Sequence, residues 1–514
     1  MSDVLPAWIA GRPVSSGETV EVTNPYDGSV VGAYVVPTVE QVHEAVAAAW
    51  AVRHELAATS AARRAEALMH VSRRIAERSD EIARLITGEN GKPLLWARAE
   101  VGRAVSTFRW AAEEARRFGG ELQRLDTDAA SEGRAAIVRR FPHGPVLGIA
   151  PFNFPLNLVA HKVAPAIAVG APIVLKPAPA TPLTALLLGE ILAETDLPEG
   201  SWSVLPVGND VAPLLTADDR LPVVSFTGSE TVGFAIQKAV PHKHVTLELG
   251  GNAAAVVCPD WSSDADLDFA ASRIATFANY QAGQACVSVQ RVLVDSSVWD
   301  AFVPRVVAAV EALPTGSPWD EATVVGPLVS EAAAVRVEAW VDEAVAAGAT
   351  LLTGGVRDGA SYTPAVLADV PADQKVVCEE VFGPVLVLQR VDGVDDAFAT
   401  VNDSRFGLQT GVFTHDIQVA FRAHRDLDLG QAFPDRQPAH EAAQRRDQRR
   451  DPRRQHLAAR HVGDVGGPAF AKADERAALL LDEARREARP VPVAPGLAVD
   501  RREQGFRAHL SDVP

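Results

Sequence analysis

Cys286 and Glu248 are the two side chains of this sequence best suited to covalent catalysis. Cys286 ends the segment Gln284-Ala285-Cys286, which begins about forty residues after Leu247-Glu248-Leu249-Gly250-Gly251. A cysteine thiolate is a strong nucleophile, and a glutamate whose pKa is raised by partial burial can act as a general base at neutral pH. In isolation, a cysteine among small residues is more often part of a core, and a glutamate can equally form a salt bridge. The other motifs have to decide between these interpretations.

Two further motifs carry polar groups beside aromatic residues. Asn153 stands in Pro151-Phe152-Asn153-Phe154-Pro155, a rigid and apolar setting for an amide with two N–H donors. Such a donor could stabilise an oxyanion, although a turn-forming asparagine is the commoner explanation for the motif alone. Glu379-Glu380-Val381-Phe382-Gly383-Pro384 places an acidic pair beside an aromatic residue and a tight turn, and such a pair is usually a solvated face.

Two motifs could bind a phosphate or a ribose. The segment from Phe226 to Gly233 follows a predicted strand and opens a predicted helix, where free backbone N–H groups favour a phosphate. Gly228 would allow close approach, and Ser229 could cap the helix and donate to a phosphate oxygen. The segment is not the usual GxGxxG pattern, so an ordinary strand-to-helix turn fits it as well. Lys176 ends another predicted strand, where ligands bind in open α/β sheets, but a solvated lysine is equally compatible.

Short apolar runs alternate with helical stretches from residue 173 to residue 257, which predicts parallel strands joined by helical crossovers in a doubly wound domain. Thr181 and Pro182 predict an N-cap and a first-turn proline for the helix after the first strand. Amphipathic helices are expected at 39–50, 61–78 and 100–118, and a second set of α/β elements from residue 265 to about residue 413. The strands expected in the doubly wound domain are 173–176, 203–205, 223–226, 245–247 and 254–257.

Composition and charge exclude several classes of function. The chain has 514 residues and a net charge of -17, so a nucleic acid or an acidic membrane surface is an unfavourable partner. Its three cysteines are too few for a disulfide framework and match no zinc pattern, so we predict no metal and a reducing compartment. The start lacks a leader pattern and no apolar run reaches a membrane-spanning length, which predicts a soluble cytoplasmic protein.

Taken together and in this order, these motifs resemble the motif set of the aldehyde dehydrogenase superfamily. The resemblance covers roughly residues 10 to 429 and includes Asn24-Pro25 and the segment from Asn402 to Gly407. The residues that carry it are Asn153, Lys176, Gly228, Ser229, Gly233, Glu248, Cys286, Glu380 and Phe382.

The resemblance implies a reaction and a role for each of these residues. Cys286 would attack an aldehyde to give a thiohemiacetal, whose oxyanion the Cys286 backbone N–H and the Asn153 amide would hold. After hydride transfer to NAD or NADP, Glu248 would activate the water that hydrolyses the thioester. The remaining residues would bind the cofactor: Lys176, Gly228, Ser229 and Gly233 at the adenosine ribose and pyrophosphate, Glu380 at the nicotinamide ribose, and Phe382 beside the ring.

The sequence departs from the family pattern in two places. NAD-preferring members often carry a ribose-binding glutamate three residues after the lysine, but Pro179 occupies this position, so both NAD and NADP stay open. From Gly430 onward 16 Lys and Arg stand against 13 Asp and Glu, while the family's glycine-rich segment and final strand are missing. We attribute this arginine-rich tail, residues 430–514, to a shifted reading frame or to poor order.

The expected protein is therefore an NAD(P)-dependent aldehyde dehydrogenase acting on a small aldehyde, with a Rossmann-like cofactor domain and a second α/β catalytic domain. Residues 1–122 and 144–258 would form the first domain, 259–429 the second, and 123–143 a bridging hairpin. The family is typically dimeric or tetrameric, but the tail puts this in doubt. The alternatives are an inactive protein that only binds the cofactor and an acylating enzyme that uses coenzyme A, against which Glu248 argues. Arg103, Tyr280 and Val287 are candidates for lining a substrate tunnel, and Arg103 points to an anionic or polar substrate.

Overall fold

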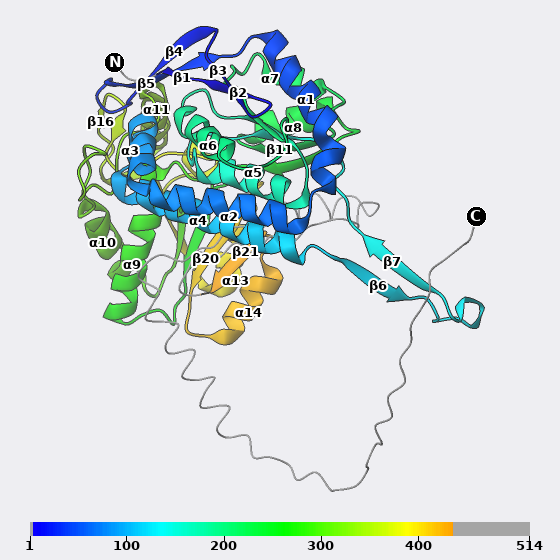
Figure 1. The fold of residues 1–514 in the computed structure, drawn as a ribbon. Helices are drawn as coiled ribbons and strands as arrows, with labels where there is room; N and C mark the ends of the chain where they lie inside the picture. The colour runs from blue at the N-terminus through cyan, green and yellow to red at the C-terminus, as the bar shows by residue number, and fades with distance from the viewer. Residues whose placement is uncertain (1–3, 435–514) are drawn as a thin grey trace, which may run out of the picture. The chain divides into compact units, whose positions relative to one another are not determined.

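The computed structural model describes residues 4–434 and contains two seven-stranded sheets (Figure 1). The first sheet has the order β12-β11-β8-β9-β10-β2-β3, in which β12 to β10 are parallel and β2 and β3 form an antiparallel edge. Its strands are β2 (Ala7–Ile9), β3 (Arg12–Val14), β8 (Val146–Ile149), β9 (Ile173–Lys176), β10 (Trp202–Val204), β11 (Val223–Thr227) and β12 (His244–Glu248). From β8 the chain builds outward to β10 and then returns to the other side of β8, so the order reverses between β8 and β11.

Helices cover both faces of this sheet, which confirms the doubly wound architecture. One face packs against a core that joins β9 to the helices α2 to α6, and the other packs against α1 and the residues around α7. Alternate residues of β9 point to opposite faces of the sheet. Val174 packs in the core with α1, whereas its neighbours in the strand pack in the core with α2 to α6. The helices are α1 (Val39–Ala58), α2 (Ala61–Glu77), α3 (Ser79–Asn90), α4 (Leu94–Arg117), α5 (Asn157–Val169), α6 (Leu183–Ala193), α7 (Ala212–Ala217) and α8 (Glu230–Ala239).

The second sheet has the order β15-β18-β19-β14-β13-β20-β21. Its strands are β13 (Ala254–Val257), β14 (Arg291–Asp295), β15 (Thr350–Thr353), β18 (Ala365–Ala368), β19 (Val385–Val391), β20 (Gln409–Phe413) and β21 (Gln431–Pro434). The helices around it are α9 (Asp264–Asn279), α10 (Trp299–Glu311), α11 (Glu331–Ala346), α12 (Lys375–Cys378), α13 (Gly393–Asn402) and α14 (Ile417–Asp426). The strand at 254–257, predicted to continue the first sheet, pairs instead with β14 and β20. Its apolar residues satisfy either sheet, so its sequence does not distinguish them.

Three small two- and three-stranded sheets complete the fold. β1 (Val4–Leu5), β5 (Val30–Val36) and β4 (Glu18–Thr23) form one, and β16 (Arg357–Asp358) and β17 (Ser361–Tyr362) form another. The third is the antiparallel pair of β6 (Gly120–Arg124) and β7 (Ala135–Arg139), which extends away from the helices in Figure 1. This pair overlaps the hairpin predicted at 123–143, and the bridging role of that hairpin stays a prediction.

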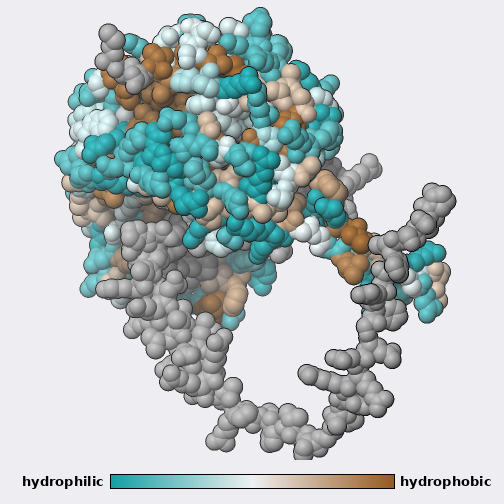
Figure 2. Space-filling model, in the orientation of Figure 1, coloured by the Kyte–Doolittle hydropathy of each residue, from teal (hydrophilic) through white to brown (hydrophobic). Residues whose placement is uncertain are grey.

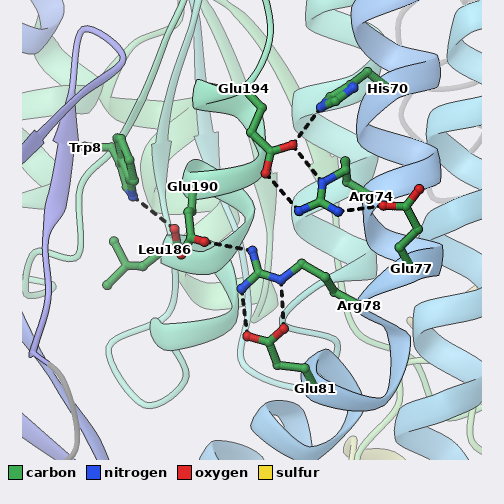
Figure 3. Close-up of polar contacts among 9 residues, drawn as sticks. All are labelled: Trp8, His70, Arg74, Glu77, Arg78, Glu81, Leu186, Glu190 and Glu194. Carbon is green, nitrogen blue, oxygen red and sulfur yellow. Dashed lines mark hydrogen bonds and ion pairs between the residues drawn. The ribbon is translucent and has the colours of Figure 1, made fainter.

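Buried and surface carboxylates fasten the helices to one another. The predicted Thr181 cap of α6 is wrong, because the helix begins after Pro182 and the Glu89 carboxylate accepts the N–H groups of Leu183 and Thr184 at 2.7 and 3.1 Å. On the outer side, Glu190 and Glu194 of α6 bind arginines of α2 and the α2–α3 junction. These contacts, drawn in Figure 3, join Glu194 to His70 and Arg74, and Glu190 to Arg78, which also binds Glu81.

Strand β21 lies inside the segment that we expected to depart from the family pattern. It pairs in parallel with β20 at the edge of the second sheet, so the ordered fold continues through Pro434. The rest of the predicted arginine-rich tail, residues 435–514, lies outside the described residues. Within residues 4–434, no helix combines the length and the apolar character needed to cross a membrane.

Candidate active site

Cys286 follows a tight segment at the end of α9. The helix ends at Asn279 and leads into η2 (Tyr280–Gly283), where Gln281 and Ala282 both have φ +53, a conformation rare for residues with a side chain. Hydrogen bonds hold this strained segment in place: the Gln284 amide donates to Gln281 O at 3.2 Å and accepts the Val329 N–H at 2.9 Å. Strain of this kind is often found at functional sites, and here it fixes the start of the Cys286 loop.

The Cys286 thiol lies close to charges of both signs. Burial, with smaller contributions from the carboxylates Glu380 and Glu248, raises its pKa to about 12, while the Arg103 guanidinium opposes this shift. The predicted nucleophile and base are thus brought together, since each carboxylate is near enough to affect the thiol. The thiol is protonated at neutral pH in this state, so a nearby base has to accept its proton before the sulfur can attack.

Glu248 is the last residue of β12, and its position follows from the parallel pairing with β11. Thr227 is its register partner, and Glu248 O accepts the Gly228 N–H at 3.0 Å. Burial raises the pKa of the Glu248 carboxyl, and the Lys162 ammonium opposes this shift. A partly buried carboxylate with a raised pKa has the property required of a general base near neutral pH.

Lys162 is a site residue that the sequence analysis missed. It lies on α5 with 4% of its surface exposed, and its ammonium donates to Thr227 Oγ1 at 2.8 Å and Ser225 Oγ at 3.2 Å. Burial lowers its pKa to about 8, while Glu248 opposes the shift. A single lysine within the mostly apolar helix α5 was the available signal, because a buried cation needs a partner.

Asn153 lies in the loop after β8 and reaches the Cys286 loop. It is 3% exposed, and its Nδ2 donates to Gln284 O at 3.0 Å, two residues before Cys286. The Gln281 side chain binds the Asn153 carbonyl in return. One Nδ2 hydrogen serves the Gln284 contact, which leaves the second hydrogen available for an oxyanion.

A buried ion pair fixes the helix that follows Asn153. Lys92 and Glu100 have fully buried side chains and bind each other, and Glu100 Oε1 accepts the N–H groups of Leu156 and Asn157 at 2.9 and 3.0 Å. These are free donors at the start of α5, where a carboxylate is favoured. Asn90 adds a bond from its amide to Phe152 O at 2.8 Å. The sequence analysis missed these residues, since their partners are distant in the chain.

Glu380 and Phe382 meet the same region from the second sheet. Glu380 Oε1 accepts the Gly251 N–H at 3.0 Å, and burial raises the pKa of its carboxyl to about 7. Phe382 has φ +48, and its ring meets the Phe152 ring edge-on at 5.8 Å. Both predicted residues are therefore placed beside the loops that carry Glu248 and Asn153.

The predicted cofactor residues of the first sheet lie at or after the carboxyl ends of β9 and β11, the strands on the two sides of β8. The order of strands reverses between β8 and β11, the position at which open α/β sheets bind ligands. Ser229 is the N-cap of α8, but its side chain makes no capping bond. A Cβ on Gly233 would approach the Leu249 side chain to 2.5 Å, so a larger residue here would require Leu249 to move. Lys176 is 2% exposed and donates to Asn209 Oδ1 at 3.0 Å. The Ser229 hydroxyl at the N-terminus of α8 and the Lys176 cation at the end of β9 fit a dinucleotide.

Arg103 and Tyr280 adjoin the thiol, as expected of residues near the substrate. The Arg103 guanidinium lies 5.4 Å from the Phe154 ring centre and affects the pKa of both Cys286 and Tyr280. Tyr280 packs against Trp96 and Phe277, with ring centres 5.5 and 5.8 Å away. Val287 follows Cys286 and is half-buried, without a contact that assigns it to the substrate. In the described part of the chain, no group of three His, Cys, Asp or Glu side chains could hold a metal ion.

Comparison with known proteins leads to the same family as the motifs and the geometry of the site. The sequence profile of the aldehyde dehydrogenase family matches residues 12–444, which extends beyond residue 429 where we expected the resemblance to end. The 3-sulfolactaldehyde dehydrogenase of Priestia aryabhattai is 40% identical over 425 residues, which cover 82% of this chain and 88% of that protein.

Two solved structures extend the comparison. Aldehyde dehydrogenase 21 from Physcomitrella patens, in complex with the reaction product succinate, matches with a TM-score of 0.83 and 42% identity. The match covers 86% of this chain and 92% of that chain. The NADP-dependent glyceraldehyde-3-phosphate dehydrogenase from Bacillus halodurans C-125, complexed with NADP, matches with a TM-score of 0.81 and 32% identity. The match covers 85% of this chain and 92% of that chain. These matches favour an active enzyme over a protein that only binds the cofactor. This chain therefore belongs to the aldehyde dehydrogenase family and oxidises an aldehyde to a carboxylic acid with NAD or NADP.

Proposed function

We propose that the substrate is a short aldehyde with a second, anionic group at its far end. The observation that carries this proposal is the position of Arg103, whose guanidinium lies near the Cys286 thiol and forms no ion pair with a carboxylate of residues 4–434. An arginine without a countercharge in a partly buried site favours a carboxylate, sulfonate or phosphate ligand. The names of the three relatives support the proposal, because each contains an aldehyde or product with such a group.

Catalysis begins at the sulfur of Cys286. The thiol loses its proton to solvent water, and the thiolate then forms a bond to the aldehyde carbon while the carbonyl oxygen becomes an oxyanion. The second Nδ2 hydrogen of Asn153 and the Cys286 backbone N–H hold that oxyanion, and one such donor contributes about 3 kcal/mol in comparable sites. A dinucleotide held beside this carbon would supply the hydride acceptor, and loss of the hydride leaves a thioester on Cys286.

Glu248 then serves the second half of the reaction. Its carboxylate takes a proton from water, the hydroxide attacks the thioester carbon, and the carbon–sulfur bond breaks to release the acid. The Lys162 ammonium, near Glu248, favours the ionised carboxylate by opposing the rise in its pKa that burial causes. Lys176, Gly228, Ser229, Gly233, Glu380 and Phe382 would hold the cofactor.

The substrate proposal is tested by Arg103→Met, with Arg109→Met on the same helix α4 as the matched control. Arg109 is exposed and lies over the Trp110 ring, away from the thiol. With succinate semialdehyde, Arg103→Met is expected to lower kcat/KM by about 10- to 100-fold, the range for losing a hydrogen bond to a charged group. With propanal the change stays below about threefold. Equal losses on both aldehydes would reject Arg103 as the anion-binding residue.

We further propose that the enzyme is cytoplasmic and assembles through the β6–β7 hairpin. The three cysteines are unpaired, which suits a reducing compartment. Leu122, Ile137 and Phe141 are 74%, 79% and 70% exposed on or just after the strands of the hairpin, which carries an apolar patch in Figure 2. Large exposed apolar side chains on a projecting strand pair support a subunit contact. A solution mass equal to the monomer at micromolar concentration would count against it.

A further inference from the structure

Arg405 connects the cofactor sheet to the catalytic sheet through two carboxylates. Its guanidinium makes a two-pronged contact with Glu379, at 2.8 and 2.6 Å, and its Nε donates to Glu230 Oε2 at 3.3 Å. Glu230 is the first residue of α8, whereas Glu379 and Arg405 belong to segments of the catalytic sheet. The three side chains are 34 to 48% exposed, so the bridge lies at the surface.

The bridge lies where the proposed cofactor residues from the two sheets meet. Ser229 directly precedes Glu230, and Glu380 directly follows Glu379. Glu230 is also close enough to Glu380 to raise its pKa, while Arg405 lowers it. The carboxylates Glu230 and Glu379 therefore lie beside the N-terminus of α8, where the anionic pyrophosphate would approach, and Arg405 offsets part of their negative charge.

Other side chains hold the Glu379–Phe382 segment without reaching α8. Gln290 accepts the Val381 N–H and donates to Val376 O and Glu379 O, and Arg336 donates to Val381 O at 2.7 Å. Both fix the main chain of this segment. Arg405 differs because it binds the Glu379 side chain and also α8, so its loss would leave the backbone in place and change the charge around the cofactor.

We propose that Arg405 is a cofactor-positioning residue, which bridges Glu230 and Glu379 and thereby offsets one of their two negative charges beside the dinucleotide phosphates. The inference rests on the proposed location of the cofactor at α8, and it adds a residue that is not among those predicted to bind the cofactor. Without Arg405 the two uncompensated carboxylates repel the pyrophosphate, so the dinucleotide binds less tightly. Screening by salt weakens this repulsion.

The experiment measures the Kd of NAD+ and of NADP+ by titration calorimetry in the absence of any aldehyde. The variants are Arg405→Met, Arg405→Lys and the double variant Arg405→Met with Glu230→Gln. Arg305→Met is the matched control, because Arg305 on α10 also bridges two carboxylates, Asp264 and Asp268, but on α9. Melting temperatures identify any variant that is only destabilised.

Arg405→Met is expected to raise both Kd values by about three- to tenfold at 20 mM salt, in line with one uncompensated charge near a surface. The increase falls below about twofold at 0.5 M salt. Arg405→Lys and the double variant restore binding at least in part, and Arg305→Met leaves it unchanged.

Three results would overturn the proposal: a wild-type Kd for Arg405→Met at low salt, an equal loss in Arg305→Met, or a double variant that binds no better than Arg405→Met. A wild-type protein that binds neither dinucleotide would also overturn it. If the Kd values follow the predicted pattern but the wild-type protein does not oxidise the aldehyde, only the proposed substrate chemistry would be contradicted.

Discussion

Replacing Glu248 by glutamine should separate the two halves of the reaction. The amide keeps the shape of the side chain but cannot accept a proton, so hydrolysis of the thioester slows while hydride transfer can still occur once. A positioned general base contributes about 10²- to 10⁴-fold, and we expect kcat to fall by this factor. The variant should fold, because Lys162 keeps its bonds to Ser225 and Thr227 and loses only its neighbouring charge.

The assay is stopped-flow absorbance of the reduced cofactor with succinate semialdehyde. The Glu248→Gln enzyme should give a burst of about one reduced cofactor per Cys286, followed by a slow steady rate, whereas Cys286→Ala should give no burst. The pH profile adds a second criterion. Since burial raises the pKa of the Glu248 carboxyl, the acid limb of wild-type kcat should lie above the ordinary carboxylate range, and the variant should lose this limb.

Two outcomes would refute this reasoning. A steady-state kcat of Glu248→Gln within about threefold of wild type between pH 6 and pH 9 would show that another group activates the water. A burst in Cys286→Ala would show that hydride transfer does not need the sulfur.

Three further predictions concern the oxyanion donor, the cofactor and a buried acid. Asn153→Ala should lower kcat by about 10²- to 10³-fold without changing the Kd of the cofactor, as measured by steady-state rates and calorimetry. Pro179→Glu should raise the Kd of NADP+ over that of NAD+, because the new carboxylate repels a 2'-phosphate; an unchanged ratio contradicts this. Burial raises the pKa of Glu89 to about 8, above its unfolded value, so its contribution to stability is present at low pH and lost as pH rises toward and through 8. Glu89→Gln should therefore show a melting temperature that falls less than that of wild type between pH 6 and pH 9, and parallel curves would exclude Glu89 as the cause.

The sequence predicts the positions of the candidate site residues well where they follow parallel strands. Asn153 follows β8, Gly228 and Ser229 follow β11, and Glu248 ends β12. Because parallel strands end at one edge of a sheet, residues distant in the chain must gather there. Local sequence is enough in these cases, since a short apolar run and the polar residues after it define both the strand and its end.

The sequence predicts less well where an element depends on its partner. The strand at Ala254–Val257 was expected in the wrong sheet, because four buried apolar residues pack equally well in either. Thr181 was expected to cap α6, but Glu89, which is more than ninety residues away, supplies the acceptor. Lys162, Glu100 and Arg405 were missed for the same reason: their roles depend on contacts that form only in the folded chain.

The active site is built where the two sheets meet, and the Gly250-Gly251 pair makes this possible. The pair follows Glu248 at the end of the first sheet, and a Cβ on Gly251 would lie 3.0 Å from the Cys286 carbonyl oxygen. A Cβ on Gly250 would overlap the Glu380 carboxylate. Groups from the second sheet thus approach the backbone of the first more closely than any side chain permits. The thiol and the two carboxylates that raise its pKa are brought together by this approach, so neither sheet alone contains the site.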